Sequence, residues 1–327
     1  MSDKEIGQTH VEAAKPGFGA RLKAHFKKFW WLHLGIFIVV FLVILLPIIF
    51  VYYPKLAQEQ INDSILEITG MQITNPTPEG FDLEVHQVIH TTSKYHPVLD
   101  SFEADVSLAK TLDKPFFSLT VPSVKAHDGV KVDIKQNIKL EDLDAFTAYA
   151  IATLKEQALD IAITGETGLR EGALPKTTVQ YDKTVNMKGL NALKGFNVTE
   201  FKLVGGEDDG TNMVGNVFIP NPSVLSLNMG DVTLALSVDG TDIGESHLKN
   251  LSIKPGDNNI EMRSKIEQAK VLGFIAGKNA KYKNGVLPIT IVGKTSMAKG
   301  KELTYFSKAL ASNTLKIELN LGPLLGM

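Results

Sequence analysis

The sequence contains no cysteine. This absence excludes a disulfide framework, a thiolate metal site and a cysteine nucleophile. The 274 residues that follow residue 53 must therefore be stabilised by a packed core without cross-links. Their number is sufficient for two domains of ordinary size.

Charge is absent from one stretch near the N-terminus, Leu34–Val51, which is 18 residues long. Sixteen of its residues are Leu, Ile, Val or Phe, and only Gly35 and Pro47 interrupt the pattern. A stretch of this length and composition crosses a bilayer core as a helix. A proline near the end of such a helix is tolerated where the freed carbonyls find partners. We therefore predict a transmembrane helix over residues 32–53.

The flanks of this stretch carry the residue types of a membrane interface. Aromatic residues mark both ends and basic residues precede it: Trp30, Trp31, Tyr52 and Tyr53, and Arg21, Lys23, Lys27 and Lys28. Lys55 is the one basic residue soon after it. The positive-inside rule then predicts a cytosolic N-terminus and a single-pass type II protein with a signal-anchor. A cleaved signal peptide is the alternative, but the apolar run starts late and lacks a small-x-small exit.

The basic flank also admits a second interpretation, contact with anionic lipid headgroups. Its topogenic role explains the same residues and is preferred. The tail of residues 1–31 carries six basic and three acidic residues, and we expect it to be largely disordered. Because the whole chain has a net charge of −2, the remainder carries −5, which is not the charge of a nucleic-acid-binding protein.

Three N-glycosylation sequons occur, at Asn62, Asn197 and Asn250. All three follow the predicted span. Their placement fits a lumenal or extracellular position for the larger part of the chain.

Period-two alternation of apolar and polar residues dominates the chain after residue 70, as expected of half-buried strands. The clearest segments are 102–108, 117–121, 130–134, 232–238, 289–291 and 315–321. Turn residues such as His127-Asp128-Gly129 and Lys254-Pro255-Gly256-Asp257 separate them. The pattern predicts a mainly β fold.

Shifting the chain by 128 residues superposes similar residues without a gap, for example Phe146 on Phe274 and Gly165 on Gly293. We predict a tandem duplication with β-rich domains at 71–197 and 198–327. The alternative is chance agreement between alternating segments, but the glycine and phenylalanine matches exceed alternation. The Asn-Pro steps at residues 75 and 221 are offset by 146, so they fit the duplication only with an insertion.

Helical spacing interrupts the strands in a few places. Residues 143–154 carry one apolar face behind acidic residues that favour a helix N-terminus. We expect a shorter counterpart near 264–276 and a juxtamembrane helix over 54–70. The predicted fold class is thus mainly β with a few helices, in which one N-terminal transmembrane helix precedes two tandem antiparallel β-sandwich-like domains.

The segments Ile219-Pro220-Asn221-Pro222-Ser223, Val232–Val238 and Ser252–Asn258 together resemble late-embryogenesis-abundant group-two domains. They look most similar to fungal single-pass membrane proteins of unknown function that carry such domains. The resemblance implies small antiparallel β-sandwiches, no catalytic residues to transfer, and a vacuolar membrane as the expected location. The first copy departs from the pattern, because it lacks the lysine-proline-glycine turn.

Two short motifs invite a catalytic interpretation. Gly293-Lys294-Thr295 matches the end of a phosphate-binding loop, but the position that requires the first glycine is Pro288. Gly244-Glu245-Ser246-His247 is similar to a nucleophile elbow whose closing glycine is replaced by Leu248. A nucleotide site is therefore disfavoured for the first motif, and a surface turn leading into a strand is the preferred interpretation of the second.

Metal binding has two candidates. His86 and His90 have the spacing of a helical metal pair, but the alternation around them indicates a strand, where residues four apart are about 13 Å from each other. Glu207-Asp208-Asp209 in a glycine-rich loop offers calcium ligands without the spaced Asp-x-Asp pattern. Solvated surface residues explain both, and we predict no metal and no cofactor.

The sequence therefore favours a non-catalytic, membrane-anchored binding or scaffold protein. Its expected partners are the lipid bilayer and a lipid or protein ligand, with no nucleic acid. Lipid handling by a sandwich whose sheets part slightly is the alternative function. A hydrolase with paired carboxylates is disfavoured, because no acid pair stands out from the turn acids.

Overall fold

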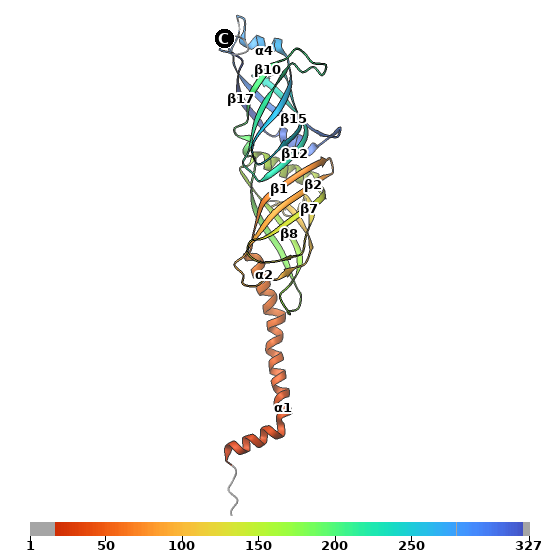
Figure 1. Ribbon diagram of the computed structural model, residues 1–327, viewed down its shortest axis with the longest axis vertical. Helices are drawn as coiled ribbons and strands as arrows, with labels where there is room; N and C mark the ends of the chain where they lie inside the picture. The colour runs from red at the N-terminus through yellow and green to blue at the C-terminus, as the bar shows by residue number, and fades with distance from the viewer. Residues whose placement is uncertain (1–16, 279, 323–327) are drawn as a thin grey trace, which may run out of the picture. The chain divides into compact units, whose positions relative to one another are not determined.

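The computed structural model describes residues 17–278 and 280–322 (Figure 1). Contacts between Cα atoms divide the chain into two units, Met1–Leu56 and Ala57–Met327. The helix α2, Tyr53–Asp63, runs across this boundary.

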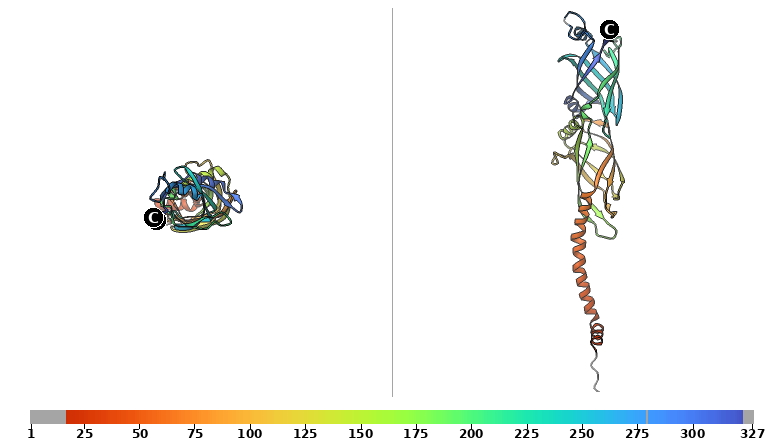
Figure 2. Two further views of the ribbon diagram at one scale, coloured as in Figure 1. Left: turned by 90° about the horizontal axis from the view of Figure 1, so that it is seen from above. Right: turned by 90° about the vertical axis from the view of Figure 1, so that its left-hand side faces the viewer.

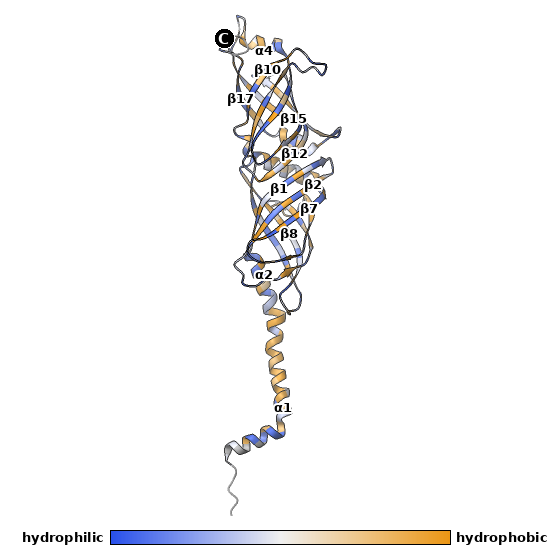
Figure 3. Ribbon diagram, in the orientation of Figure 1, coloured by the Kyte–Doolittle hydropathy of each residue, from blue (hydrophilic) through white to orange (hydrophobic). Residues whose placement is uncertain are grey.

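The first unit is built around the helix α1, Phe18–Pro47, which bends at Phe29, whose φ of −117° and ψ of 23° are not helical. A π-helical turn, Ile48–Tyr52, follows Pro47 directly. Pro47 has no N–H to donate to the carbonyl one turn before it, so the regular hydrogen bonding of the helix is interrupted here. The apolar window of this helical region has a mean hydropathy of 3.4 (Figure 3). It is long and apolar enough to cross a membrane, so it is a candidate membrane span.

The expected disorder of the tail is wrong for residues 18–31, which are helical. Alanine, leucine, lysine and arginine dominate the first turns of this helix, and their high helix propensity explains the difference. Residues 1–16 lie outside the described residues.

The second unit contains two groups of strands. The first module, residues 65–188, consists of β1 Ile65–Thr77, β2 Gly80–His90, β3 Val98–Leu99, β4 Phe102–Leu108, β5 Phe117–Val121, β6 Val124–Lys125, β7 Val130–Lys139, α3 Leu143–Lys155, β8 Ala158–Arg170 and β9 Thr177–Lys188. A short 3-10 helix, η2 Asn191–Leu193, leads onward. The second module, residues 197–320, consists of β10 Asn197–Leu203, β11 Met213–Asn221, β12 Leu225–Val238, β13 Thr241–Ile253, β14 Gly256–Ile266, α4 Gln268–Ile275, β15 Val286–Ala298, β16 Lys301–Glu302, α5 Thr304–Ala311 and β17 Thr314–Asn320.

The two modules share their strand topology. In the first, antiparallel ladders join β1 to β2, β2 to β7, β4 to β5, β4 to β8 and β8 to β9. In the second, the same five pairings join β10 to β11, β11 to β14, β12 to β13, β12 to β15 and β15 to β17. The strands β8 and β15 cover equivalent residues at the offset of 128. This repetition supports the duplication inferred from the sequence.

The same comparison separates the two Asn-Pro steps. Asn75 lies on β1, whose counterpart is β10, whereas Asn221 ends β11. The two dipeptides therefore occupy different strands of the repeat. The domain division at residues 197 and 198 stays a prediction, since one compact unit contains both modules.

A parallel ladder joins the modules, in which Met71, Gln72 and Ile73 of β1 pair with residues 225–227 of β12. The resulting 11-stranded sheet runs through both modules, and a 6-stranded sheet packs against its β1, β2 and β7 part. The predicted fold class is confirmed, because the chain is mainly β, with sandwich-like sheets behind one apolar helix.

The predicted helix over residues 54–70 is too long. α2 ends at Asp63, and β1 begins at Ile65. Spacing of isoleucines at 61, 65 and 68 suits a helix, but residues 65–77 gain a long ladder with β2 as a strand. The helix near 264–276 is also shorter than predicted, since Ser264–Ile266 complete β14.

The junction between the modules is a cluster of aromatic rings. Phe146 of α3 is fully buried, and its ring centroid lies 5.2 Å from Phe81, 5.9 Å from Phe116 and 5.1 Å from Tyr305 of α5. The Tyr305 hydroxyl donates a hydrogen bond to the Thr77 carbonyl at 2.8 Å. Packing and a parallel ladder thus hold the two modules end to end (Figure 2).

Candidate functional site

The residues predicted for the membrane interface flank the apolar part of the helix. Trp30 and Trp31 are 63% and 62% exposed, and Tyr52 at the other end is 64% exposed. Lys23, Lys27 and Lys28 are also exposed, and Tyr53 is half-buried. The side chain of Arg21 lies outside the described residues. Aromatic rings at both ends of an apolar helix suit an interface position.

The three sequon asparagines are exposed but are not brought together. Asn62 lies on α2, Asn197 begins β10 and Asn250 lies on β13. They lie on three different elements and do not form a common site.

Two histidines lie on the outer face of the sheet formed by β1, β2 and β7. His86 Nδ1 is 2.7 Å from an oxygen of Asp133 on β7, and its Nε2 is 3.5 Å from Glu84. His90 Nε2 is 3.0 Å from Glu67 on β1, and its Nδ1 is 3.7 Å from Asp128. Alternation along β2 places both rings on the solvent side, each between two carboxylates.

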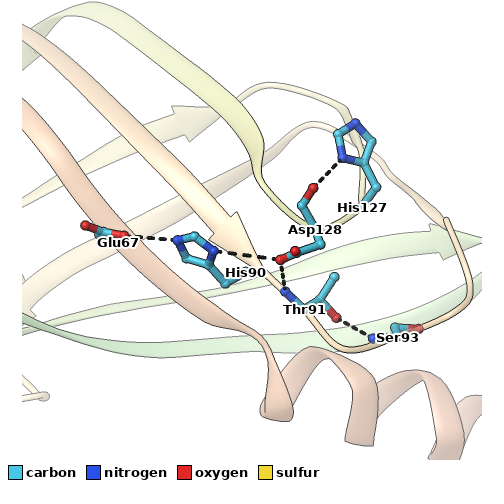
Figure 4. A network of polar contacts seen from close by, with 6 residues as sticks. All are labelled: Glu67, His90, Thr91, Ser93, His127 and Asp128. Atoms are coloured by element: carbon cyan, nitrogen blue, oxygen red, sulfur yellow. Dashed lines mark hydrogen bonds and ion pairs between the residues drawn. The ribbon is translucent and has the colours of Figure 1, made fainter.

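A short network surrounds His90 (Figure 4). The backbone N–H of Thr91 donates to Asp128 at 3.1 Å, and the ring of His127 contacts the Asp128 carbonyl at 3.0 Å. The Thr91 hydroxyl accepts the N–H of Ser93. Within the described residues the side-chain partners of His86 and His90 are carboxylates.

Metal binding gains no support from this face. In the described ranges, no group of three or more His, Asp or Glu side chains is arranged to hold an ion. The strand geometry separates the histidines, as the sequence predicted.

Beside the histidines, Asp82 of β2 accepts hydrogen bonds from Asn75 and Asn137, each at 2.8 Å. The Asn137 and Asn75 amides lower the pKa of the Asp82 carboxyl. The outer face of β1, β2 and β7 is therefore an ordered polar surface, in which two amides favour the ionised form of Asp82.

The acidic loop 205–210 is occupied by a cation of the chain itself. Arg263 pairs with Glu207 and lies 3.6 Å from Asp209. Asp209 also accepts the Thr211 N–H at 2.9 Å, and this bond lowers the pKa of Asp209. Two of the three acids of the loop, Glu207 and Asp209, are thus neutralised by Arg263.

Both short motifs lie inside strands. Gly293-Lys294-Thr295 is in the middle of β15, and Lys294 pairs with Glu245. Ser246 of β13 is buried and its hydroxyl accepts from Ser264 at 3.0 Å, while the neighbouring His247 contacts Thr233. The expected turn leading into a strand is present, but it lies upstream at residues 239–240. Ser246 itself is inside β13 and is paired on both sides in the sheet. Neither motif has the loop-to-helix geometry that its chemistry requires.

The interior of both modules is apolar and nearly filled. A cavity of about 30 Å³ in the first module is lined by side chains that include Leu83, Phe117, Ile134 and Tyr181. One of about 20 Å³ in the second is lined by residues that include Met213, Leu236 and Ile291. Each has the size of a water site and lacks the space for an acyl chain as the side chains stand.

The first module has a seam, defined as the edge between the neighbouring strands β5 and β7, where the second module has a ladder. In the second, β13 pairs with β14 over residues 244–247 and 263–266. The equivalent strands β5 and β7 form no ladder with each other in the described part of the chain. A side chain bridges them instead: the Gln136 amide accepts the Thr120 N–H at 3.0 Å and donates to the Thr120 carbonyl. This seam lies beside Phe117 and Ile134, which line the cavity of the first module.

One buried cation was missed by the sequence analysis. Lys183 of β9 is 5% exposed, and its ammonium donates to the carbonyls of Ile61, Asn62 and Ser64 at the end of α2. Burial lowers the pKa of the Lys183 ammonium. The alternation along β9 could have indicated that Lys183 is buried, because it lies at a buried position between Tyr181 and Val185.

These features define a class, a β-rich protein of two stacked modules behind one candidate membrane span. Residues 114–236 match the family described as "Protein of unknown function (DUF3712)". The matched region begins before β5 and ends in β12, so it crosses the junction between the modules. A search of curated proteins found no match.

Among solved structures, the periplasmic chaperone SfaE aligns with 78% of this chain and 98% of its own, at 11% identity and a TM-score of 0.17. A bacterial adhesin from Mobiluncus mulieris covers 71% of this chain and 79% of its own, at 7% identity and a TM-score of 0.20. The exo-chitosanase CsxA of Amycolatopsis orientalis covers 77% and 26%, at 13% identity and a TM-score of 0.20. Likenesses at these scores carry no argument about function.

Proposed function

We propose that the protein is a membrane-anchored, non-catalytic binding or scaffold protein. The observation that carries the proposal is the continuous sheet through both modules, sealed by the parallel β1–β12 ladder and the Phe146 cluster. A spacer of this kind holds exposed surfaces at fixed separation from one another. The outer face of β1, β2 and β7, which carries His86 and His90, offers one such exposed recognition surface.

The proposal includes a direction. The basic flank before α1 favours a cytosolic N-terminus, and the exposed sequons favour a lumenal or extracellular second unit. The fungal vacuolar membrane is proposed from the resemblance to late-embryogenesis-abundant group-two domains alone.

The test uses the full chain in nanodiscs, screened against hydrolase and transferase substrates and, in cells, by proximity labelling from both ends of the chain. We expect no turnover, and reproducible neighbours that differ between the two ends. The substitution Phe146→Ala should loosen the junction and make the set of proteins labelled from the C-terminal end less reproducible. Robust turnover that a single substitution abolishes would exclude a non-catalytic role.

Lipid handling is the second candidate, and the unladdered β5–β7 seam favours it. Separation of the two strands at Gln136 would connect the apolar cavity of the first module with solvent. Native mass spectrometry of the full chain, released from nanodiscs of defined lipid, tests this idea. We expect a copurified lipid mass that increases in the Gln136→Ala variant, and bare polypeptide in both samples would exclude lipid handling.

A further inference from the structure

The helix α4 stands where α3 stands in the repeat, but the two helices have different surroundings. α3 carries six buried residues and packs on α5 of the next module. α4 has one buried residue, Ile275, and Leu272 on it is 48% exposed. Phe274, the equivalent of the fully buried Phe146, is only half-buried. α4 is therefore a module-end helix with an apolar surface that lacks the cover α3 has.

The segment around α4 is also basic. Residues 268–285 contain four lysines and no acidic residue. Two of these lysines neutralise acids nearby: Lys270 lies 2.7 Å from Glu267, and Lys281 lies 2.6 Å from Asp239. Lys278 and Lys283 are exposed and form no ion pair with another described residue. The end of the second module thus combines an exposed leucine with two uncompensated positive charges.

A second copy of the chain is a poor fit for this surface. The element that covers α3 is α5, and its residues Tyr305, Phe306 and Leu310 are already buried. A second copy would offer no free α5 for α4 to pack against. Lysines around an exposed apolar side chain instead suit a surface of negative headgroups above an acyl layer.

We propose that the α4 end of the second module, Gln268–Ile275 with Lys278 and Lys283, docks on an anionic lipid surface. Leu272 enters the headgroup region, and the lysines contact lipid phosphate or carboxylate groups. In the second unit this end lies opposite residues 57–65, which follow the candidate span in the chain (Figure 1). The chain would then hold two lipid surfaces, one through its span and one through α4.

The test places the full chain in nanodiscs of phosphatidylcholine and measures recruitment to liposomes of phosphatidylcholine mixed with phosphatidylserine. We expect recruitment that high salt weakens, and little recruitment to pure phosphatidylcholine. The variant Leu272→Ser/Lys278→Glu/Lys283→Glu should bind at least about tenfold more weakly, since each lysine near an anionic surface contributes roughly a fivefold effect. The matched control Leu174→Ser/Lys131→Glu/Lys139→Glu also changes one exposed leucine and two exposed lysines, and it should bind as the wild type does.

A second readout does not depend on these variants. Because the chain has no cysteine, Leu272→Cys provides a unique site for an environment-sensitive fluorophore. Its emission should shift to the blue on phosphatidylserine liposomes alone. Equal recruitment of the α4 variant and the wild type would overturn the proposal. A fluorophore emission that does not shift would also overturn it. Self-association of the nanodisc-bound chain that the α4 variant abolishes would overturn it as well, because a second copy of the chain would then occupy this surface.

Discussion

Gln136 of β7 makes two hydrogen bonds with the backbone of Thr120 in β5, one through each end of its amide. A side chain here replaces a rung of the ladder that the second module forms between β13 and β14. The first module is consequently a two-sheet sandwich along this edge, whereas the second continues its sheet around the corner. The two copies of one topology have thus diverged at this edge.

Replacing Gln136 by alanine should loosen this seam. The Thr120 N–H and carbonyl lose their partner, at a cost of about 1–2 kcal/mol of unfolding free energy. We expect faster hydrogen exchange at β5, measured by mass spectrometry, with little change at β13. Gln72→Ala on exposed β1 is the control and should leave exchange at β5 as it is. Unchanged exchange at β5 in Gln136→Ala would show that the seam is held by packing.

Lys183 should be among the most sensitive polar residues of the chain. Substitution by alanine removes a donor from three carbonyls at the end of α2. The Ile61 carbonyl keeps the N–H and hydroxyl of Ser64, whereas a buried carbonyl that loses its partner costs about 1–3 kcal/mol. We expect a loss of about 2–4 kcal/mol in denaturant unfolding and early proteolytic cleavage near Ser64. Lys188→Ala, exposed on the same strand, should change stability by less than about 0.5 kcal/mol. Equal effects of the two substitutions would contradict a role for the α2 carbonyls.

Much of the fold could be predicted from local patterns. The segments 102–108 and 117–121 coincide with β4 and β5, and the helix at 143–154 coincides with α3. In these segments the spacing of the apolar residues in the sequence matches the spacing of the buried residues in the structure. The start of β1 was mistaken for a helix, since Ile61, Ile65 and Ile68 have helical spacing. The pairing of residues 65–77 with β2, which the local pattern does not contain, makes this segment a strand. Gln136 and Lys183 could not be assigned roles, because their partners lie 16 and about 120 residues away.

Phe146 and Phe274 occupy equivalent positions in the two modules, so Phe274 is a control for the role of Phe146 at the junction. Phe146→Ala empties a fully buried site between four aromatic rings, and we expect a loss of about 3–5 kcal/mol. Phe274→Ala, at the equivalent position of α4, should cost about 1 kcal/mol or less because the ring is half-solvated. Calorimetry should also show Phe146→Ala splitting one unfolding transition into two. Similar losses for the two variants would mean that α4 is covered as α3 is.

Alkaline pH should reveal the burial of Tyr181. Burial raises the pKa of the Tyr181 phenol from 10.0 to about 12, because the phenolate is disfavoured in the apolar interior. The unfolded chain loses this proton at lower pH than the folded chain. The stability contribution of the neutral phenol is therefore complete below pH 10 and is lost as the pH rises from 10 to about 12. Tyr181→Phe should flatten that part of the stability profile by about 2 kcal/mol, measured as the difference from wild type in urea unfolding. A profile as steep as that of the wild type would mean that other groups cause the loss.

Glycosylation tests the proposed direction in which the chain crosses a membrane. If the second unit is lumenal, the exposed Asn197 and Asn250 are presented to the oligosaccharide transferase, whereas Asn62 on α2 follows the span within a few residues. We expect an endoglycosidase-sensitive mobility shift that Asn197→Gln and Asn250→Gln reduce stepwise and that Asn62→Gln leaves nearly unchanged, because a site so close to the bilayer is hard to reach. The hydroxyl variants Thr199→Ala and Ser252→Ala destroy the same sequons without touching the asparagines, so they should reproduce the two reductions. Protection of the N-terminal tail from protease in intact organelles, with no shift in any variant, would instead place the second unit in the cytosol.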